Sequence, residues 1–554
     1  MSPNPSARIR CALIVPLVTV MFTGILLTSA AAAAPGPMLD YESQQRAEQI
    51  QAAARWRLAF RPSLQVLQQT VAQLRAAPGV TPEAAATADR LLASLAAPGT
   101  ASTSPVPPTA LAPDARRTLV HAAALLAGLP WTPARDFLSA LDLQTQAPIW
   151  SGEHETVSFT LQYAAPAARA RYTLDLHRAA PGTSATPMLG ERVRTLASGT
   201  LAPTLPLATS VALTDVADGA YLLVARVDVE DGDTEATEIV ESVHVVRDLD
   251  ARHAALVAEL AANTGHEEAK LLAEYPYALA RAVRDGTREL VSYDFPAAMQ
   301  RSSTIAAALA NGRDEVRQAK GLQSRAYRFA ETGELLPYQL YVPSNWSPDR
   351  QWPLVVALHG ANLDETNMLG RANGQMQRLA EAHGFIVVSP LGYRLNSAYG
   401  SPRMAALASD PERLRRSEAD VLAVLDLVSR EYAVDPARRY LTGNSMGGGG
   451  TFWLGAQHPA LWAGIAPVAF GGVRPEDTAG LAQVPMHVVC GDRDELGMLA
   501  RVQDSLAVLR SAGIVPEYIE VPGGTHTGAF DTALPGIFAF FAKHARGQDG
   551  TPRR

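Results

Sequence analysis

The chain has 554 residues, of which 47% are hydrophobic and 19% charged, and its formal net charge at pH 7 is -7. This composition is typical of a globular protein and excludes a chain that is disordered throughout. The charge is modest and no basic stripe occurs, so nucleic acid is not an expected partner. One hydrophobic core rarely serves so long a chain, so we expect about two to four domains.

Residues 1–34 have the order of a secretory signal peptide. Arg8 and Arg10 precede the apolar run CALIVPLVTVMFTGILLTS, which leads into the small-residue stretch AAAAAPG. We therefore expect an exported protein, periplasmic or secreted, whose mature chain begins near Pro35. The alternative is an uncleaved anchor helix, because the run approaches the length of a membrane span. Cys11 stands at the start of the apolar run, where a lipoprotein cleavage site is not expected, so no lipid anchor is predicted.

Removal of the signal leaves Cys490 as the single cysteine, so no internal disulfide is expected. Cys490 lies in the apolar run MHVVC and is predicted to be a buried, small hydrophobic residue.

The next three regions differ in the period of their apolar residues. Residues 35–145 are predicted to be helical, with runs such as RLLASLAA at helical spacing and a linker rich in Pro, Ser and Thr, APGTASTSPVPPTALAP. Residues 149–247 carry short alternating runs such as TVSFTLQY and AYLLVARVDV, which predict a β-sandwich. The stretch DVADGAYLLVARVDVEDGD resembles a hairpin of bacterial immunoglobulin-like modules, so this domain is expected to act as a spacer or to contact carbohydrate or a surface. Residues 248–321 return to the helical period and predict a connector of about three helices.

From residue 325 to 546, strand-like runs alternate with helical ones. WPLVVALHG, GFIVVSP, RRYLTGNS, GIAPVAF, MHVVCGD and YIEVPGG are nearly continuous apolar strands. This alternation predicts a mostly parallel sheet with helices on both faces, and such sheets bind ligands at the carboxyl ends of their strands.

One serine lies among glycines where a strand meets a helix. Gly443-Asn444-Ser445-Met446-Gly447 follows RRYLT and precedes a helical run, which is G-x-S-x-G in a strand-turn-helix context. The sharp turn would present the hydroxyl of Ser445 above the sheet. Ser445 is therefore the predicted nucleophile.

A serine nucleophile needs a base and an orienting carboxylate. His526 is the expected base because it lies in a Gly-rich loop after the last strand, whereas His487 falls inside a strand and His544 on the terminal helix. Asp494 is preferred over Asp492 as the orienting carboxylate, because a turn is needed after the strand before a side chain can point back to the imidazole.

Acyl transfer also requires N–H donors for the developing oxyanion. The amide of Met446 is one candidate, and Gly360 or Ala361 in the loop after WPLVVALHG supplies the other. His359 is expected to shape that loop rather than transfer protons. No cluster of His, Asp and Glu has recognisable ligand spacing, so neither a metal nor another cofactor is expected.

Together these motifs resemble the α/β-hydrolase superfamily. The stretch RRYLTGNSMGGGGTFWLGAQHPALWAGIAPVAFGG is similar to exported bacterial esterases related to poly(3-hydroxybutyrate) depolymerases and to feruloyl and acetylxylan esterases, some of them labelled as peptidases. The resemblance covers residues 327–545 and implies Ser445, Asp494 and His526 as a catalytic triad. Some of these esterases also carry an immunoglobulin-like module before the catalytic domain.

The sequence departs from that family beside the nucleophile. Gly449 stands where relatives often have a bulky residue and Phe452 where they have Trp, which implies a wider or more mobile acyl pocket. Trp453, Phe452 and Tyr393 are weak candidates for the substrate pocket, and core packing is the alternative reading of the tryptophan. The long loop 391–416 is a candidate cover for the site.

The sequence therefore predicts an exported serine carboxylic ester hydrolase that forms an acyl-enzyme, with a small or polymeric ester as substrate. One rival is a serine peptidase of the prolyl-oligopeptidase type, although no propeller repeat precedes the hydrolase region. The other is a binding protein with a vestigial hydrolase domain.

Overall fold

The computed structural model describes residues 64–77, 79–95, 114–180, 188–201, 205–230, 234–547 and 552–553. The predicted signal segment 1–34 with Cys11 and the linker 97–113 lie outside the described residues. Within the described ranges, no helix has both the length and the apolar character needed to cross a membrane. The chain divides into two compact units, Met1–Arg247 and Asp248–Arg554.

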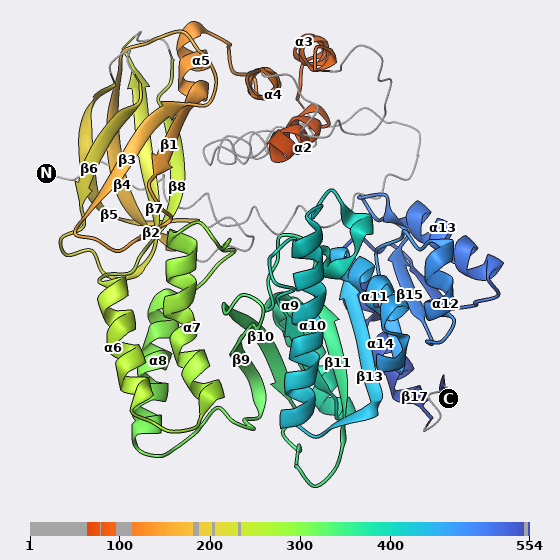
Figure 1. The fold of residues 1–554 in the computed structure, drawn as a ribbon. Coiled ribbons are helices and arrows are strands. Elements are labelled where there is room, and N and C mark those ends of the chain that lie inside the picture. The colour runs from red at the N-terminus through yellow and green to blue at the C-terminus, as the bar shows by residue number, and fades with distance from the viewer. Residues whose placement is uncertain are drawn as a thin grey trace, which may run out of the picture. The chain divides into compact units, whose positions relative to one another are not determined.

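The first unit contains helices and two β-sheets (Figure 1). One sheet has the order β1-β3-β6 and the other β2-β8-β7-β4-β5. Side chains of both sheets, among them Phe159 from β3 and Leu223 from β7, share one hydrophobic core. Two sheets around one core agree with the predicted sandwich, while the immunoglobulin-like assignment stays a prediction. The described elements are α2 (Leu64–Arg75), α3 (Pro82–Ala93), α4 (Ala115–Leu126), α5 (Pro133–Ala140), β1 (Leu141–Thr145), β2 (Ile149–Trp150), β3 (His154–Leu161), β4 (Ala170–Ala180), β5 (Met188–Leu201), β6 (Leu207–Ala212), β7 (Gly219–Val229) and β8 (Thr237–Val245).

Strand β1 corrects the predicted boundary between the helical region and the sandwich. Residues 141–145 were assigned to the helical region 35–145, but they pair with β3 in antiparallel register from Leu141 opposite Leu161. Helix α5 ends only one residue earlier, so the apolar residues of the helix run directly into those of the strand. Pairing with a distant strand, which no local pattern records, decides the conformation of this segment.

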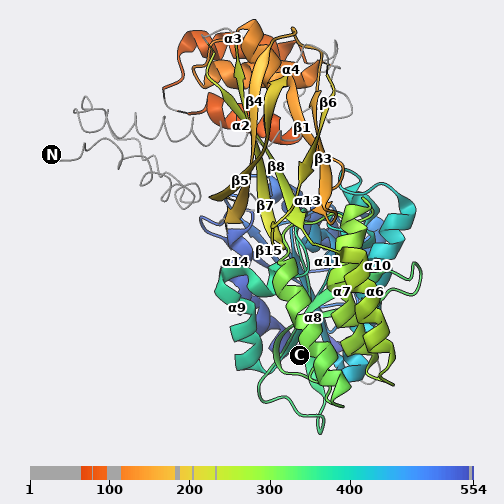
Figure 2. The same ribbon diagram turned by 90° about the vertical axis from the view of Figure 1, so that its left-hand side faces the viewer.

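The second unit begins with three helices, α6 (Leu249–Ala261), α7 (Glu267–Arg284) and α8 (Phe295–Ala310). They lie side by side (Figure 2), and α7 also contacts the first two strands of the following sheet. The helical period of residues 248–321 predicts these three helices.

An eight-stranded sheet forms the centre of the second unit, in the order β16-β15-β14-β13-β11-β12-β10-β9. Its strands from β11 to β16 pair in parallel, whereas β10 is antiparallel to both β9 and β12. The mostly parallel sheet of the prediction is thus confirmed, and β9 begins at Gly321, ahead of the predicted boundary at 325. The strands are β9 (Gly321–Arg328), β10 (Leu335–Val342), β11 (Trp352–Leu358), β12 (Ile386–Pro390), β13 (Val434–Asn444), β14 (Gly464–Val468), β15 (His487–Gly491) and β16 (Glu517–Val521).

Helices cover both faces of this sheet (Figure 1). Alternate side chains of β11 separate into two cores, with Val356 among the side chains of α10, α11 and α13 and Val355 among those of α9 and α14. This division follows from the two-residue period of a strand. The helices are α9 (Asn367–His383), α10 (Pro411–Glu431), α11 (Met446–Gln457), α12 (Thr478–Leu481), α13 (Met498–Ser511) and α14 (Gly528–Lys543).

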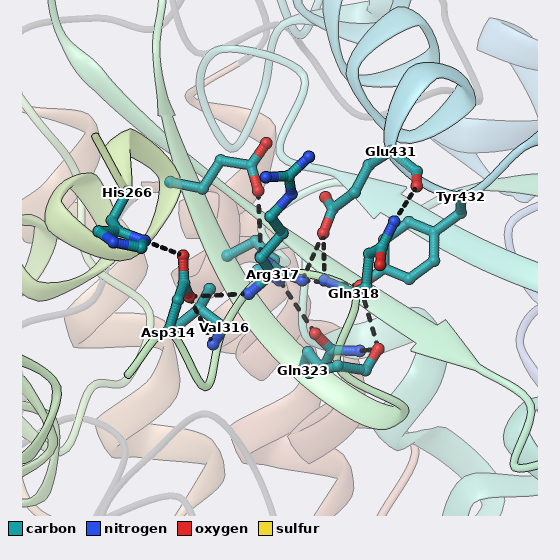
Figure 3. Close-up of polar contacts among 11 residues, drawn as sticks. His266, Asp314, Val316, Arg317, Gln318, Gln323, Glu431 and Tyr432 are labelled. Carbon is teal, nitrogen blue, oxygen red and sulfur yellow. Dashed lines mark hydrogen bonds and ion pairs between the residues drawn. The ribbon is translucent and has the colours of Figure 1, made fainter. Parts of the chain in front are cut away.

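Polar contacts on both sides hold the segment 311–320, which joins α8 to β9 (Figure 3). The carboxylate of Asp314 lies 2.9 Å from Nδ1 of His266, at the start of α7. The backbone N–H of Gln318 donates to Oε1 of Glu431, at the end of α10, over 2.8 Å. Arg325 of β9, whose side chain is 2% exposed, also binds Glu431, over 3.1 Å. Polar contacts therefore connect the segment 311–320 to α7 and to α10, and a buried ion pair connects β9 to α10.

Candidate active site

Ser445 lies on the turn between β13 and α11 with φ 58° and ψ -121°. A positive φ is unfavourable for a residue with a side chain, and such strain concentrates at functional turns. The turn is held in place because the Ser445 N–H donates to the carbonyl of Val468 on the neighbouring strand, over 3.0 Å.

The glycines on either side of the serine are required by close backbone approach. A Cβ at Gly443 would lie 2.4 Å from the carbonyl oxygen of Gly447, and one at Gly447 would lie 2.0 Å from that of Leu358 on β11. Both separations are far below van der Waals contact. The strand, the turn and the helix can meet at Ser445 only because these two positions carry no side chain.

His526 and Asp494 are in direct contact. Nδ1 of the imidazole lies 2.8 Å from Oδ2 of Asp494, and the two side chains are 7% and 0% exposed. His526 precedes α14 in the loop after β16, and Asp494 follows β15. A carboxylate at Nδ1 favours the tautomer with its proton there and leaves Nε2 free to accept a proton.

Two further hydrogen bonds hold the backbone of His526. Its N–H donates to Oε2 of Glu495 over 2.9 Å, and its carbonyl accepts from Nδ2 of Asn444 over 3.2 Å. Asn444 is the residue immediately before Ser445, so the loop of the base is tied to the turn of the nucleophile. In the described structure Nε2 of His526 is buried and has no hydrogen-bond partner.

The candidate oxyanion donors lie beside the serine. A Cβ on Gly360 would come within 3.6 Å of the Cβ of Ser445, which places this loop against the nucleophile, and the next residue, Ala361, is partly buried against the core. Met446 opens α11, and the first N–H groups of a helix have no acceptor within the helix itself. The N–H of Met446 therefore needs no acceptor within the helix, and the loop of Gly360 and Ala361 lies beside the same serine.

His359 supports this loop. Its Nδ1 and Nε2 lie 2.8 Å from the carbonyl oxygens of Gly360 and Leu391, respectively. Burial lowers the pKa of His359, and its contacts with the two carbonyl oxygens act in the opposite direction. The ring links the loops after β11 and β12, in agreement with the shaping role expected from the sequence.

The residues suggested for a substrate pocket lie mostly in the core. Phe452 and Tyr393 are each 6% exposed and belong to the main cluster, and Nε1 of Trp453 donates to Glu418 over 2.8 Å. Trp453 also lines a cavity of about 390 Å³ with Leu414, Leu422 and other residues of α10 and the loop before it. For Phe452 and Tyr393, core packing is therefore the better reading.

The sequence predicts a wider acyl pocket beside Gly449, and this prediction is wrong. A Cβ there would lie 2.8 Å from Cε1 of Phe470 and 2.9 Å from Sδ of Met404. Side chains from two other loops thus fill the space that a bulky residue would take.

The alternative residues have other roles. Asp492 is exposed, and His487 pairs with Glu517 at 3.2 Å. His544 follows α14 rather than lying on it, and its Nδ1 is 2.8 Å from the carbonyl oxygen of Phe540 in that helix. Cys490 is buried, and burial raises the pKa of its thiol to about 12, which suits a packing role. Among the described residues, no group of His, Cys, Asp and Glu could hold a metal ion.

Sequence reasoning missed several residues that support the site. Arg371, Asn444 and Glu495 bind the segment around His526, and Asp420 binds the loop after β12. In the sequence, these roles were indicated only by the position of Asn444 inside G-x-S-x-G and by that of Glu495 beside Asp494.

Comparison with known proteins finds a family match that contains Ser445 and ends before Asp494 and His526. Residues 330–471 match the Esterase family model. The bifunctional acetylxylan esterase/xylanase XynS20E of Neocallimastix patriciarum is 30% identical over 166 residues, which are 30% of this chain and 22% of that protein. Poly(3-hydroxyalkanoate) depolymerase C of Paucimonas lemoignei is 31% identical over 137 residues, 24% of this chain and 30% of that protein. This chain thus spans less than a third of the length of either relative.

Among solved structures, the fluorophosphonate-binding serine hydrolase FphF of Staphylococcus aureus aligns with 40% of this chain and 98% of its own, at a TM-score of 0.33 and 17% identity. The family match lies within the domain from β9 to α14, whose mostly parallel sheet has helices on both faces. Residues 330–471 are therefore similar in sequence to esterases.

Proposed function

We propose that this protein is an exported serine carboxylic ester hydrolase that works through an acyl-enzyme. The observation that carries the proposal is the pairing of His526 with Asp494 at 2.8 Å while Nε2 stays buried and unpartnered in the described structure, on a loop tied to the residue before Ser445. A base held in this way has one free nitrogen, and Asn444 ties its loop to the turn that carries Ser445. In the described structure Nε2 is not hydrogen-bonded to the hydroxyl of Ser445, so the proposal requires the two groups to come together when substrate binds.

In the proposed reaction, Oγ of Ser445 attacks the ester carbonyl carbon as its proton passes to Nε2 of His526. Asp494 stabilises the resulting imidazolium, and the amides of Met446 and of Gly360 or Ala361 donate to the oxyanion. Collapse of the tetrahedral intermediate breaks the bond to the alcohol oxygen, which leaves with the proton from Nε2. Water then attacks the acyl-serine by the same steps and releases the acid.

The proposed substrates are carboxylic esters, including esters carried on polymers. Two relatives are named as an acetylxylan esterase/xylanase and a poly(3-hydroxyalkanoate) depolymerase, and these names support carboxylic esters as the substrate class. The β-sandwich would contact such a polymer or a surface, a role that rests on the resemblance of DVADGAYLLVARVDVEDGD to bacterial immunoglobulin-like modules.

The test is the hydrolysis of p-nitrophenyl acetate by the chain beginning near residue 35. Ser445→Ala should lower kcat by at least about 10³-fold, because the nucleophile is removed. Ser511→Ala is the matched control, since its exposed hydroxyl only binds a carbonyl within α13. Full activity in Ser445→Ala would reject the proposal.

A substrate panel separates this proposal from its rivals. Acetate, butyrate, feruloyl and hydroxybutyrate esters should be cleaved, and peptide p-nitroanilides should not. Preferred cleavage of the anilides would favour a peptidase. Failure of a fluorophosphonate probe to label the protein would favour a binding protein without catalysis.

Export belongs to the proposal on the strength of Arg8, Arg10 and the apolar run that follows them. Esterase activity should appear in the periplasm or the medium, and amino-terminal sequencing of that protein should begin near residue 35. An unprocessed terminus in the cytoplasm would contradict export.

A further inference from the structure

Helix α9 is interrupted close to the candidate site. Its backbone leaves the helical region at Arg371 (φ -63°, ψ 157°), and the next three residues, Ala372, Asn373 and Gly374, have φ of 48°, 53° and 73°. Left-handed conformations are unfavourable for residues with a Cβ, above all for alanine, which has no polar side chain to bond locally. Such a segment persists only where its surroundings hold it.

The guanidinium of Arg371 makes contacts that explain what this interruption achieves. Its Nε donates to Oδ1 of Asp531 over 2.7 Å, Nη2 donates to the carbonyl of Thr527 over 2.9 Å, and Nη1 reaches Oδ1 of Asn444 over 3.4 Å. The group also lies over the ring of Phe530, 4.6 Å from its centroid, and the side chain is only 11% exposed. One rigid fork therefore joins the residue before Ser445 to the residue after His526.

Asn444 extends the connection to the base itself. Its Oδ1 receives the Arg371 contact while its Nδ2 donates to the carbonyl of His526 over 3.2 Å. The guanidinium of Arg371 fixes the orientation of the Asn444 amide, because only the amide oxygen can accept a hydrogen bond from it. The amide nitrogen is then directed to the carbonyl of His526. Loss of the arginine would free this amide to rotate and weaken the bond to His526.

Control of the His526 backbone matters for proton transfer. The loop before it contains Gly523 and Gly524, which restrict the backbone little, yet a general base must come within about 2.6–3.2 Å of the serine oxygen. Displacement by about 1 Å can lower a rate a hundredfold.

We propose that Arg371 is a positioning residue, which holds the His526 loop against the Ser445 turn through Asn444 and Thr527. This inference rests on the proposed serine hydrolase function. Arg371 does not contact the reacting atoms, and its effect is on the placement of the base. The alternative is a purely structural role, in which the Arg371 and Asp531 pair only fastens α9 to α14.

Two variants separate the positioning role from the structural one. Arg371→Lys keeps a positive charge for Asp531 but loses the planar fork that reaches Thr527 and Asn444. Asp531→Asn removes the ion pair and leaves those two contacts available. Arg378→Lys is the matched control, because Arg378 also binds carbonyls of the interruption, those of Ala372 and Asn373, without reaching the site.

The measurements are kcat and KM for p-nitrophenyl acetate, the rate of labelling by a fluorophosphonate, and the thermal midpoint. Arg371→Lys should lower kcat and the labelling rate by about 10- to 100-fold, with KM within about twofold of the wild type. Asp531→Asn and Arg378→Lys should keep kcat within about threefold. Asn444→Ala should reproduce the loss of kcat, since it breaks the same connection.

The role of Arg371 is overturned if Arg371→Lys retains wild-type kcat, or if Asp531→Asn loses as much kcat as Arg371→Lys does. Ser445→Ala, included in the same series, tests the underlying function separately. An inactive Ser445→Ala beside a fully active Arg371→Lys would reject only the positioning role, whereas an active Ser445→Ala would reject both.

Discussion

His526 receives contacts at every polar group that the proposed mechanism needs fixed. Asp494 binds Nδ1 of its ring, Glu495 binds its N–H, and Asn444 binds its carbonyl. Asp494 and Glu495 come from the loop after β15 and Asn444 from the end of β13, so two segments at the rim of the sheet hold the base. Of the four groups, only Nε2 is left for chemistry in the described structure.

The carboxylate that orients His526 can be tested against its neighbour in sequence. Asp494→Asn should lower kcat by roughly 10³- to 10⁴-fold, because the amide no longer stabilises the imidazolium and favours the wrong tautomer. Asp492→Asn is the matched control, since Asp492 is exposed, and kcat should stay within about twofold. Equal losses in the two variants would contradict the assignment of Asp494.

The glycine after the nucleophile gives a prediction on stability. Gly447→Ala would place a Cβ 2.0 Å from the carbonyl oxygen of Leu358, so backbone must move, and we expect a loss of about 3 kcal/mol or more in the free energy of unfolding. Gly536→Ala in α14 has ordinary clearance, 4.0 Å to His487, and should be neutral or stabilising by about 0.5–1 kcal/mol. Denaturant unfolding of both variants measures the contrast, and a stable Gly447→Ala would contradict it.

The sequence was informative for residues whose role is set by local order and uninformative for those set by distant packing. Ser445, Asp494 and His526 could be proposed because each follows a recognisable apolar strand. Arg371 could not, because its partners lie 73 to 160 positions away along the chain. The space beside Gly449 was misjudged for the same reason, since Met404 and Phe470 reach it from separate loops.

At the scale of elements, hydrogen bonds to Asp420 of α10 hold the loop after β12. Oδ2 of Asp420 accepts from the N–H of Tyr393 over 2.7 Å, and Oδ1 accepts from the hydroxyl of Tyr327 over 2.5 Å. Farther along the same loop, the hydroxyl of Tyr399 donates to the carbonyl of His359 over 3.2 Å. A buried carboxylate on a helix thus supports the loop that supports the candidate oxyanion donors.

Burial raises the pKa of Asp420 from 3.8 to about 6, despite the hydrogen bonds that lower it. The folded state therefore binds this proton more tightly than the unfolded state, and stability falls as pH rises between about 4 and 6. Asp420→Asn has no titratable group at this position. Between pH 4 and pH 7.5 the free energy of unfolding of the wild type should therefore fall by about 2 kcal/mol relative to that of the variant. Denaturant unfolding at the two pH values measures this difference, and a constant difference would contradict a raised pKa.

Helices and strands whose apolar residues recur with a clear period could be predicted. Short elements at the change from a helical to a strand period could not. The three helices of residues 248–321 and the strands of the large sheet follow their apolar patterns. Strand β1 has only five residues and follows α5 without a loop, so its partner β3 decides its conformation rather than its own sequence.

At the scale of the molecule, all residues of the candidate site belong to the unit Asp248–Arg554. That unit also includes α6, α7 and α8, and α7 is joined to β9 by Arg328 and Glu274 at 3.4 Å and by Arg325 and Glu268 at 3.8 Å. The helical connector of the sequence prediction is therefore structurally part of the unit that carries the candidate site.

Two truncated chains test this division. Residues 248–554 should fold and hydrolyse p-nitrophenyl acetate with kcat/KM within about threefold of the full chain, because domains of this size fold alone. Residues 321–554 should be insoluble or inactive, since removal of α7 exposes the parts of β9 and β10 that this helix covers. Arg325 would also lose its partner Glu268. An active 321–554 chain would show that the three helices are dispensable.

Strand β16 ends the large sheet, and this position has a consequence for solubility. A terminal strand offers its outer row of backbone groups to any other extended chain, and here Ile519 and the preceding Val515 are 43% and 83% exposed. Glu517 and Glu520 stand exposed on the same strand, and two copies brought together along it would oppose these charges. We therefore expect these two glutamates to oppose aggregation, and a chain with valine at both positions should form edge-to-edge assemblies.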